Sequence, residues 1–184
     1  MEKKTRNKVL IASLIGSSIE WFDYFLYGTV AALVFNEVFF HSEDPTIGLL
    51  LAYASFALAF FIRPLGGIIF SHIGDRIGRK KTLVLTLSLM GGSTVLMGFL
   101  PTYESIGVAA PILLIILRLV QGIGLGGEWG GALLLAVEYA RKEKRGLFGS
   151  IPQMGVTIGM LLGTLALSIM TLLPNEAFMT WGWR

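Results

Sequence analysis

Long apolar segments separated by short polar ones dominate the chain. Five such segments lie at about residues 9–35, 47–70, 83–100, 110–137 and 147–173. A membrane-spanning helix needs roughly 20 mostly apolar residues, and each segment meets or approaches that length. The pattern therefore predicts an all-α integral membrane protein with five transmembrane helices.

The composition excludes most soluble classes of protein. Hydrophobic residues make up 54% of the 184 positions and charged residues 15%, with a mean hydropathy of +0.71. Soluble domains carry nearer a quarter charged residues, so a soluble enzyme is disfavoured. The chain has no cysteine, and its two histidines, His41 and His72, lie far apart. We therefore expect neither a metal site nor an enzyme, since no nucleophile–base pair is evident either.

The basic residues predict the orientation in the membrane. Of the 15 lysines and arginines, 12 precede the first segment or lie in the second–third and fourth–fifth connections. The connections at 36–46, 101–109 and 174–180 contain none. Cytoplasmic loops carry the excess of basic residues, so the N-terminus is expected in the cytoplasm. The pI of 9.3 then reflects these loops and their contact with anionic lipids of the bilayer, not nucleic acid.

Five charged residues lie within the apolar segments: Glu20, Asp23, Arg63, Arg118 and Glu128. Charges at that depth are costly unless they face protein or water. Counting 1.5 Å per helical residue places Asp23 and Arg118 at one depth, with opposite charges. The same count places Arg63 and Glu128 together near the inner boundary, which predicts an inner-mouth pair.

The first segment carries a polar stripe with helical spacing. Because residues three and four apart share one helix face, this stripe cannot face lipid. It forms either a water-filled path with titratable carboxylates or a structural salt bridge to a neighbouring helix. Two acids and two phenols on one face favour the path. The stripe consists of Ser13, Gly16, Ser17, Glu20, Asp23, Tyr24 and Tyr27.

Two strips of glycine occur at spacings of four residues in the fourth and fifth segments. Small residues at this spacing let membrane helices approach closely, so packing is favoured over a substrate-lining role. The strips are Gly122, Gly126 and Gly130, and then Gly155, Gly159 and Gly163.

Three motifs resemble signatures of the major facilitator superfamily. Residues 74–80 (GDRIGRK) resemble its motif between the second and third helices, with Ser71 where a glycine is usual. Arg118 and Gln121-Gly122 resemble its fourth-helix motif. Glu138 followed by Arg145-Gly146 resembles its fourth–fifth loop. All three lie at the corresponding places in the predicted topology.

Four further stretches narrow the resemblance. Residues 19–28, 63–67, 126–131 and 181–184 are similar to the metabolite–proton symporter branch, which carries proline and betaine, 2-oxoglutarate, shikimate, citrate and other carboxylates. The resemblance implies symport of a small organic acid or zwitterionic osmolyte across the bacterial cytoplasmic (inner) membrane. It implies no cofactor, with the proton as coupling ion.

The same resemblance implies that the chain is incomplete. Facilitators have twelve helices in two six-helix halves, and this chain stops at the start of the sixth. We expect an N-terminal fragment that needs a C-terminal half as partner and does not transport alone. Without that half, the stripe is expected to face lipid or loosely held water. A facilitator of the sugar-porter or drug-exporter type, and a membrane scaffold without transport, remain the alternatives.

The resemblance also implies roles for particular residues. Alongside the inner-mouth pair, we expect a chamber for substrate and proton in the membrane interior and a gate at the cytoplasmic face. The chamber residues are Glu20, Asp23, Tyr24, Tyr27, Arg118 and Gln121, and the gate residues are Asp75, Arg76, Arg79, Glu138 and Arg145.

Overall fold

The computed structural model describes the backbone of residues 3–138, 140 and 142–184, and side chains at 10–78, 81–127, 137, 140 and 142–184. Helices and short connections make up all of this part of the chain. The five long helices are α1 (Lys3–Val30), α3 (Pro45–Ile77), α4 (Arg79–Gly98), α6 (Ala109–Glu138) and α7 (Arg145–Met170).

Short helical pieces extend or join these five helices. A π-helical segment, η1 (Ala31–Phe35), and a last turn, α2 (Asn36–Val38), continue α1 without a break in the chain direction. The other short pieces are α5 (Tyr103–Ile106), η2 (Lys142–Lys144), α8 (Asn175–Ala177) and a second π-helical segment, η3 (Phe178–Gly182).

Local chemistry explains where the second long helix begins and ends. The Asp44 carboxylate accepts the Thr46 backbone N–H at 2.8 Å, and Pro45 occupies the first helical position. Both are favoured at helix starts. Gly78 ends α3 with φ at 92°, a region that favours glycine. The chain therefore reverses sharply there into α4, at the loop whose motif the sequence singled out.

Four helical stretches within the described residues are long and apolar enough to cross a membrane: Pro45–Ile77, Lys81–Gly98, Ala109–Gly127 and Lys142–Met170. The prediction of an all-helical membrane protein is thus confirmed in its coarser form. α1 is not among the four, because the acids and serines of its stripe lower its hydropathy. A fifth span therefore stays a prediction.

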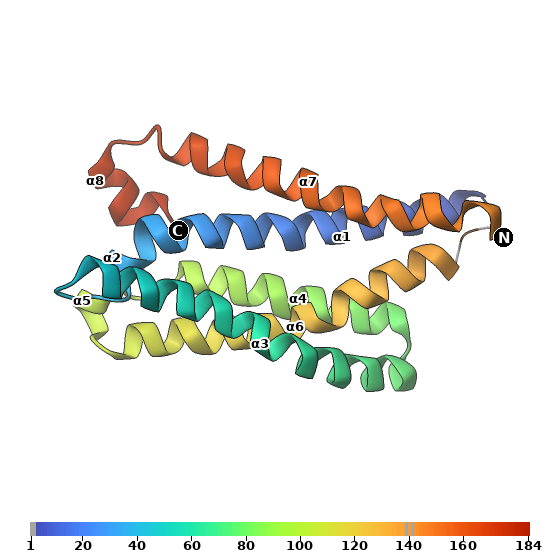
Figure 1. The fold of residues 1–184 in the computed structure, drawn as a ribbon, viewed down its shortest axis with the longest axis horizontal. Helices are drawn as coiled ribbons and strands as arrows, with labels where there is room; N and C mark the ends of the chain where they lie inside the picture. Colours follow the sequence, from blue (N-terminus) through green and yellow to red (C-terminus); the bar gives the residue numbers. More distant parts are fainter. Residues whose placement is uncertain (1–2, 139, 141) are drawn as a thin grey trace.

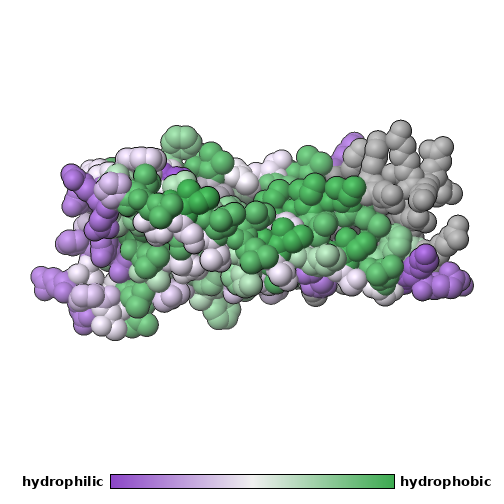
Figure 2. Space-filling model, turned by 90° about the horizontal axis from the view of Figure 1, so that it is seen from above, coloured by the Kyte–Doolittle hydropathy of each residue, from purple (hydrophilic) through white to green (hydrophobic). Residues whose placement is uncertain are grey.

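The helices form two groups (Figure 1). α1 packs mainly against α7, whereas α3 and α4 pack mainly against α6. In the view of Figure 2, hydrophobic residues cover the middle of the elongated molecule, and hydrophilic residues gather toward its two ends. Large apolar side chains such as Phe61, Ile68 and Leu161 are well exposed. This surface suits a lipid surrounding better than water.

Glycines make the closest contacts within each group. A Cβ at Gly159 would lie 2.6 Å from the Phe22 backbone nitrogen of α1, and one at Gly155 would lie 2.7 Å from Ser17. In the other group, a Cβ at Gly126 would overlap the Arg63 carbonyl. No side chain larger than hydrogen fits at these positions without moving the helices. The packing interpretation of both glycine strips is therefore confirmed for their described members.

Candidate functional site

The polar stripe of α1 faces the interior of the bundle. Glu20 and Asp23 are only 4% and 7% exposed, and Ser13, Ser17 and Tyr27 are also buried. Other helices of the same chain cover them. The expectation that this face would meet lipid or loose water in the isolated chain is therefore wrong, because α3, α6 and α7 pack against α1 and Thr94 of α4 bonds to Asp23.

Asp23 is the centre of a polar cluster that joins three helices. Thr94 of α4 donates its hydroxyl to Asp23 Oδ1 at 2.8 Å. Gln121 of α6 donates from Nε2 to Asp23 Oδ2 at 2.6 Å and to the Thr94 hydroxyl at 2.9 Å. Both carboxylate oxygens therefore have donors, as a buried charge requires. We call Asp23, Tyr27, Thr94, Arg118 and Gln121 the Asp23 cluster.

Arg118 supplies the counter-charge. Its Nη1 lies 3.6 Å from Asp23 Oδ2 and donates to Gln121 Oε1. The Gln121 amide thus turns its NH₂ toward the carboxylate and its carbonyl toward the guanidinium, the arrangement that satisfies both charges. Arg118 and Gln121 are 2% and 0% exposed. The prediction that Arg118 lies against the acidic face of the first helix is confirmed.

Aromatic rings complete the surroundings of Arg118. Its guanidinium carbon lies 3.2 Å from the centre of the Tyr27 ring and 5.4 Å from that of Phe56. Such cation–π contacts stabilise a cation that has lost its water. The Tyr27 hydroxyl, in turn, forms a 3.0 Å hydrogen bond with Ser55 Oγ of α3. Tyr27 therefore connects the cluster to a fourth helix.

Glu20 and Arg63 form a second charged region one helical turn away. Arg63 and Glu20 attract each other electrostatically. The Arg63 guanidinium also lies 4.2 Å from the centre of the Phe60 ring, whereas its Nε is buried without a hydrogen-bond partner. Tyr24 is half-buried and packs edge-on against Phe60. The pairing of Arg63 with Glu128 stays a prediction, because the Glu128 side chain lies outside the described residues.

The proposed cytoplasmic gate is described only in part. Asp75, Arg76 and Arg145 are exposed and lie in or beside the α3–α4 and α6–α7 connections. The side chains of Arg79 and Glu138 lie outside the described residues. The gate therefore stays a prediction.

Two members of this polar network were not predicted. Thr94 and Ser55 lie in apolar helices, and hydroxyls there commonly bond to their own backbone, so the residue type alone carries little information. A usable signal existed for Thr94. Thr94 lies in α4 at a depth close to that of Asp23 in α1. At that depth a hydroxyl can donate a hydrogen bond to a buried carboxylate.

Buried opposite charges inside an apolar helical bundle are typical of membrane transport proteins. The comparison with known families agrees, since residues 8–184 match the family described as "Sugar (and other) transporter". The chain belongs to this family, within the major facilitator superfamily, and so is a transporter-family protein rather than an enzyme.

Several curated relatives cover nearly the whole chain. The inner membrane metabolite transport protein YhjE of Escherichia coli is 54% identical over 98% of this chain, and the shikimate transporter of Escherichia coli is 48% identical over 96%. The proline/betaine transporter of Salmonella typhimurium is 41% identical over 96%. The chain spans 41%, 41% and 35% of these proteins, respectively. No solved structure was found to match the chain.

Proposed function

We propose that the chain works as the N-terminal part of a longer carrier, which couples uptake of a small organic acid or zwitterionic osmolyte to proton entry. The bundle would span the inner membrane five times, with its N-terminus in the cytoplasm. The names of the relatives, which include shikimate and proline/betaine transporters, support this class of substrate.

The observation that carries the proposal is the buried pair of Asp23 and Arg118. Its charges lie 3.6 Å apart, and Gln121 bonds to both residues. A buried ion pair of this kind contributes little to stability compared with apolar residues of similar size. It does provide a carboxylate that can bind a proton and an arginine that can then turn to a substrate carboxylate. In this mechanism Asp23 holds the coupling proton, while Glu20 lies in the same chamber.

Transport by a chimera would test the coupling. The chain replaces the matching 178-residue segment of the Escherichia coli shikimate transporter, and the chimera is reconstituted in lipid vesicles. Labelled shikimate, proline, betaine, 2-oxoglutarate and citrate are offered with and without an inward proton gradient, and glucose represents the sugar-porter alternative. We expect accumulation of an acid or zwitterion only with the gradient.

Acid-to-amide variants then locate the proton site. A chimera with Asp23→Asn and Glu20→Gln should lose gradient-driven accumulation but retain substrate exchange between the two sides. Glu37→Gln, the same change at an exposed acid that follows α1, is the matched control and should accumulate normally. Undiminished accumulation in the double variant would rule this site out.

The 184-residue chain alone tests whether a longer carrier is needed. We expect no transport, since alternating access requires two halves that rock against each other. Saturable, uncoupler-sensitive uptake by the chain alone would overturn this part of the proposal.

A further inference from the structure

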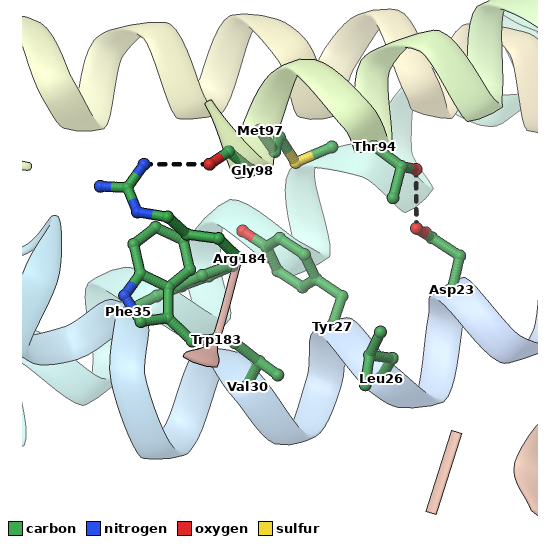
Figure 3. A pocket seen from close by; sticks show the side chains of 10 residues that line it. All are labelled: Asp23, Leu26, Tyr27, Val30, Phe35, Thr94, Met97, Gly98, Trp183 and Arg184. Atoms are coloured by element: carbon green, nitrogen blue, oxygen red, sulfur yellow. Dashed lines mark hydrogen bonds between the residues drawn. The ribbon is translucent and has the colours of Figure 1, made fainter. Parts of the chain in front are cut away.

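The Thr94 hydroxyl has two acceptors within reach and a single hydrogen. Its Oγ1 lies 2.8 Å from Asp23 Oδ1 of α1 (Figure 3). It also lies 3.0 Å from the backbone oxygen of Met90, one turn earlier in α4. A hydroxyl carries one hydrogen and two lone pairs, and it rotates freely. Thr94 can therefore donate either to the carboxylate or to its own helix, and rotation of the O–H bond alone exchanges the two.

Gln121 occupies one lone pair of this hydroxyl. Its Nε2 donates one hydrogen to Asp23 Oδ2 at 2.6 Å and the other to Thr94 Oγ1 at 2.9 Å. Its Oε1 accepts from Arg118, so turning the amide round would place its NH₂ against the guanidinium. Thr94 therefore has one lone pair and one hydrogen left, and Asp23 Oδ1 and the Met90 carbonyl are their neighbours.

The two carboxylate oxygens of Asp23 differ in their polar neighbours. Among the described residues, Oδ2 faces the Gln121 NH₂ group and Arg118 Nη1, at 2.6 and 3.6 Å. Both groups are donors and neither can accept a hydrogen bond. Oδ1 faces the Thr94 hydroxyl, which can accept as well as donate. An added proton therefore has an acceptor beside Oδ1 and none beside Oδ2.

We propose that Thr94 is a positioning residue of the proton site, which directs the coupling proton to Asp23 Oδ1 by changing from donor to acceptor. In the ionised state the Thr94 hydroxyl donates to Oδ1. When Oδ1 takes a proton from a hydronium ion, water is released and the new carboxyl O–H donates to Thr94 Oγ1. The Thr94 hydrogen then turns to the Met90 carbonyl. This inference rests on the proposed function, in which Asp23 holds the proton.

Both protonation states then keep the hydrogen bond between α1 and α4. Neither state leaves a buried polar group of this site without a partner, which would be costly. Gln121 also stays bonded to Oδ2 in both states. The bound proton removes only the negative charge that faces Arg118. Protonation therefore weakens the contact with the arginine of α6 and leaves the contact with α4 in place.

The other charged and titratable groups around Asp23 act on its charge and not on the choice of oxygen. Arg118 of α6 faces the carboxylate from the Oδ2 side. Arg63 of α3, and Glu20 and Tyr27 of α1, interact with Asp23 electrostatically. No hydrogen bond from these three residues to Oδ1 is present in the described part of the chain. Thr94 is therefore the residue that distinguishes the two oxygens.

The other hydroxyls of α4 supply a matched control. In the described part of this helix, they donate to backbone oxygens one turn earlier, the usual bond of a hydroxyl in an apolar helix. These residues are Thr82, Thr86, Ser88 and Ser93. Thr86 is the closest match to Thr94, because it is a buried threonine of the same helix whose hydroxyl bonds to Leu83 at 2.9 Å.

Infrared difference spectroscopy of the chain in lipid vesicles tests the bond directly. Spectra at low and high pH differ by the C=O stretching band of each acid that takes up a proton, and Asp23→Asn identifies the Asp23 band by its loss. A carboxyl O–H that donates a hydrogen bond lowers the frequency of this band. Thr94→Val removes the hydroxyl and keeps the branched shape, so the Asp23 band should move to higher frequency. Thr86→Val should leave the band in place.

A serine at position 94 guards against a packing defect in the valine variant. Thr94→Ser keeps the hydroxyl, so its Asp23 band should lie at the frequency of the unsubstituted chain. A band that does not move in Thr94→Val would overturn the proposal, and so would a band that moves equally in Thr94→Ser. Absence of any band that depends on Asp23 would show that this carboxylate takes up no proton, which would overturn the proposal as well.

Transport by the chimera tests whether the bond matters for coupling. In Thr94→Val the ionised Asp23 lacks one donor, so gradient-driven accumulation should slow about tenfold, which corresponds to one hydrogen bond, while substrate exchange continues. Thr94→Ser and Thr86→Val should accumulate at close to the unsubstituted rate. Full accumulation in Thr94→Val would overturn the positioning role. Absence of gradient-driven accumulation in the unsubstituted chimera would instead refute the proposed function, and the infrared result would be unaffected.

Discussion

Substitutions of Asp23 and Arg118, singly and together, measure how strongly this pair holds the bundle together. At 3.6 Å, two unit charges attract by about 5 kcal/mol at an effective dielectric constant of about 20. Desolvation of both groups offsets most of this gain. The pair therefore contributes little to the free energy of unfolding. Removing one partner lowers that free energy substantially, because the other charge stays buried.

The two single variants should differ. Asp23→Asn leaves Arg118 charged at any accessible pH, so we expect a loss of about 3–5 kcal/mol in the free energy of unfolding. Arg118→Met leaves a carboxylate that retains its Thr94 and Gln121 donors and that can take up a proton. Arg118→Met should therefore lower the free energy of unfolding by less, about 1–3 kcal/mol. The double variant buries no unpaired charge, so it should lose about 2 kcal/mol less than the sum of the two single losses.

Reversible unfolding of the chain in mixed micelles, driven by sodium dodecyl sulfate and followed by circular dichroism, measures these differences. Glu37→Gln neutralises an exposed acid on the continuation of α1 and should change stability by less than about 0.5 kcal/mol. Losses that add within about 0.5 kcal/mol in the double variant would show that the charges do not interact, and the reasoning would be refuted.

Three further predictions address the packing, the aromatic contact and the gate. Gly159→Val should lower the unfolding free energy by about 1–3 kcal/mol in the same assay, because its Cβ meets the α1 backbone, whereas Gly91→Val, with no atom within 4 Å of its Cβ, should have little effect. Tyr27→Phe should lower the unfolding free energy by only about 1 kcal/mol, since one hydrogen bond is lost and the ring beneath the guanidinium remains. Reversing the charge of Arg79 or of Glu138 alone should abolish transport by the chimera, and exchanging the two residues should restore it. Additive losses in the double variant would exclude their pairing.

Depth along a helix could be predicted from the sequence, but rotation and side-chain partners could not. Counting residues placed Asp23 and Arg118 at one level, and they lie in contact. The count cannot show that Gln121 would lie between their side chains, because that depends on how α6 is rotated against α1. Thr94 was missed for the same reason. Depth places Thr94 near Asp23, but only the rotation of α4 shows that its hydroxyl donates to the carboxylate.

The fold was predictable to a similar extent. The lengths of the apolar segments indicated where the helices lie, because a helix needs a long apolar stretch to cross a bilayer. It did not show that α3 continues through His72 to Ile77, since a helix can extend past the apolar layer while its charged end stays in water. Nor did it indicate the π-helical turn at Ala31–Phe35, which lies within an unbroken apolar sequence.

If Asp23 holds the coupling proton, as proposed, the distribution of contacts would link that proton to movement of the helices. Glycines such as Gly159 and Gly126 hold the helices together within the α1–α7 group and within the α3–α4–α6 group. α6 also packs against α1 and α7, and polar contacts of Asp23 and Tyr27 connect one group to the other through α4, α6 and α3. Close apolar packing does not respond to a proton, whereas the bonds of a carboxylate do. In the proposed carrier, neutralising Asp23 would therefore weaken the connection between the groups and leave each group intact, so that one bound proton changes how the two groups sit against each other.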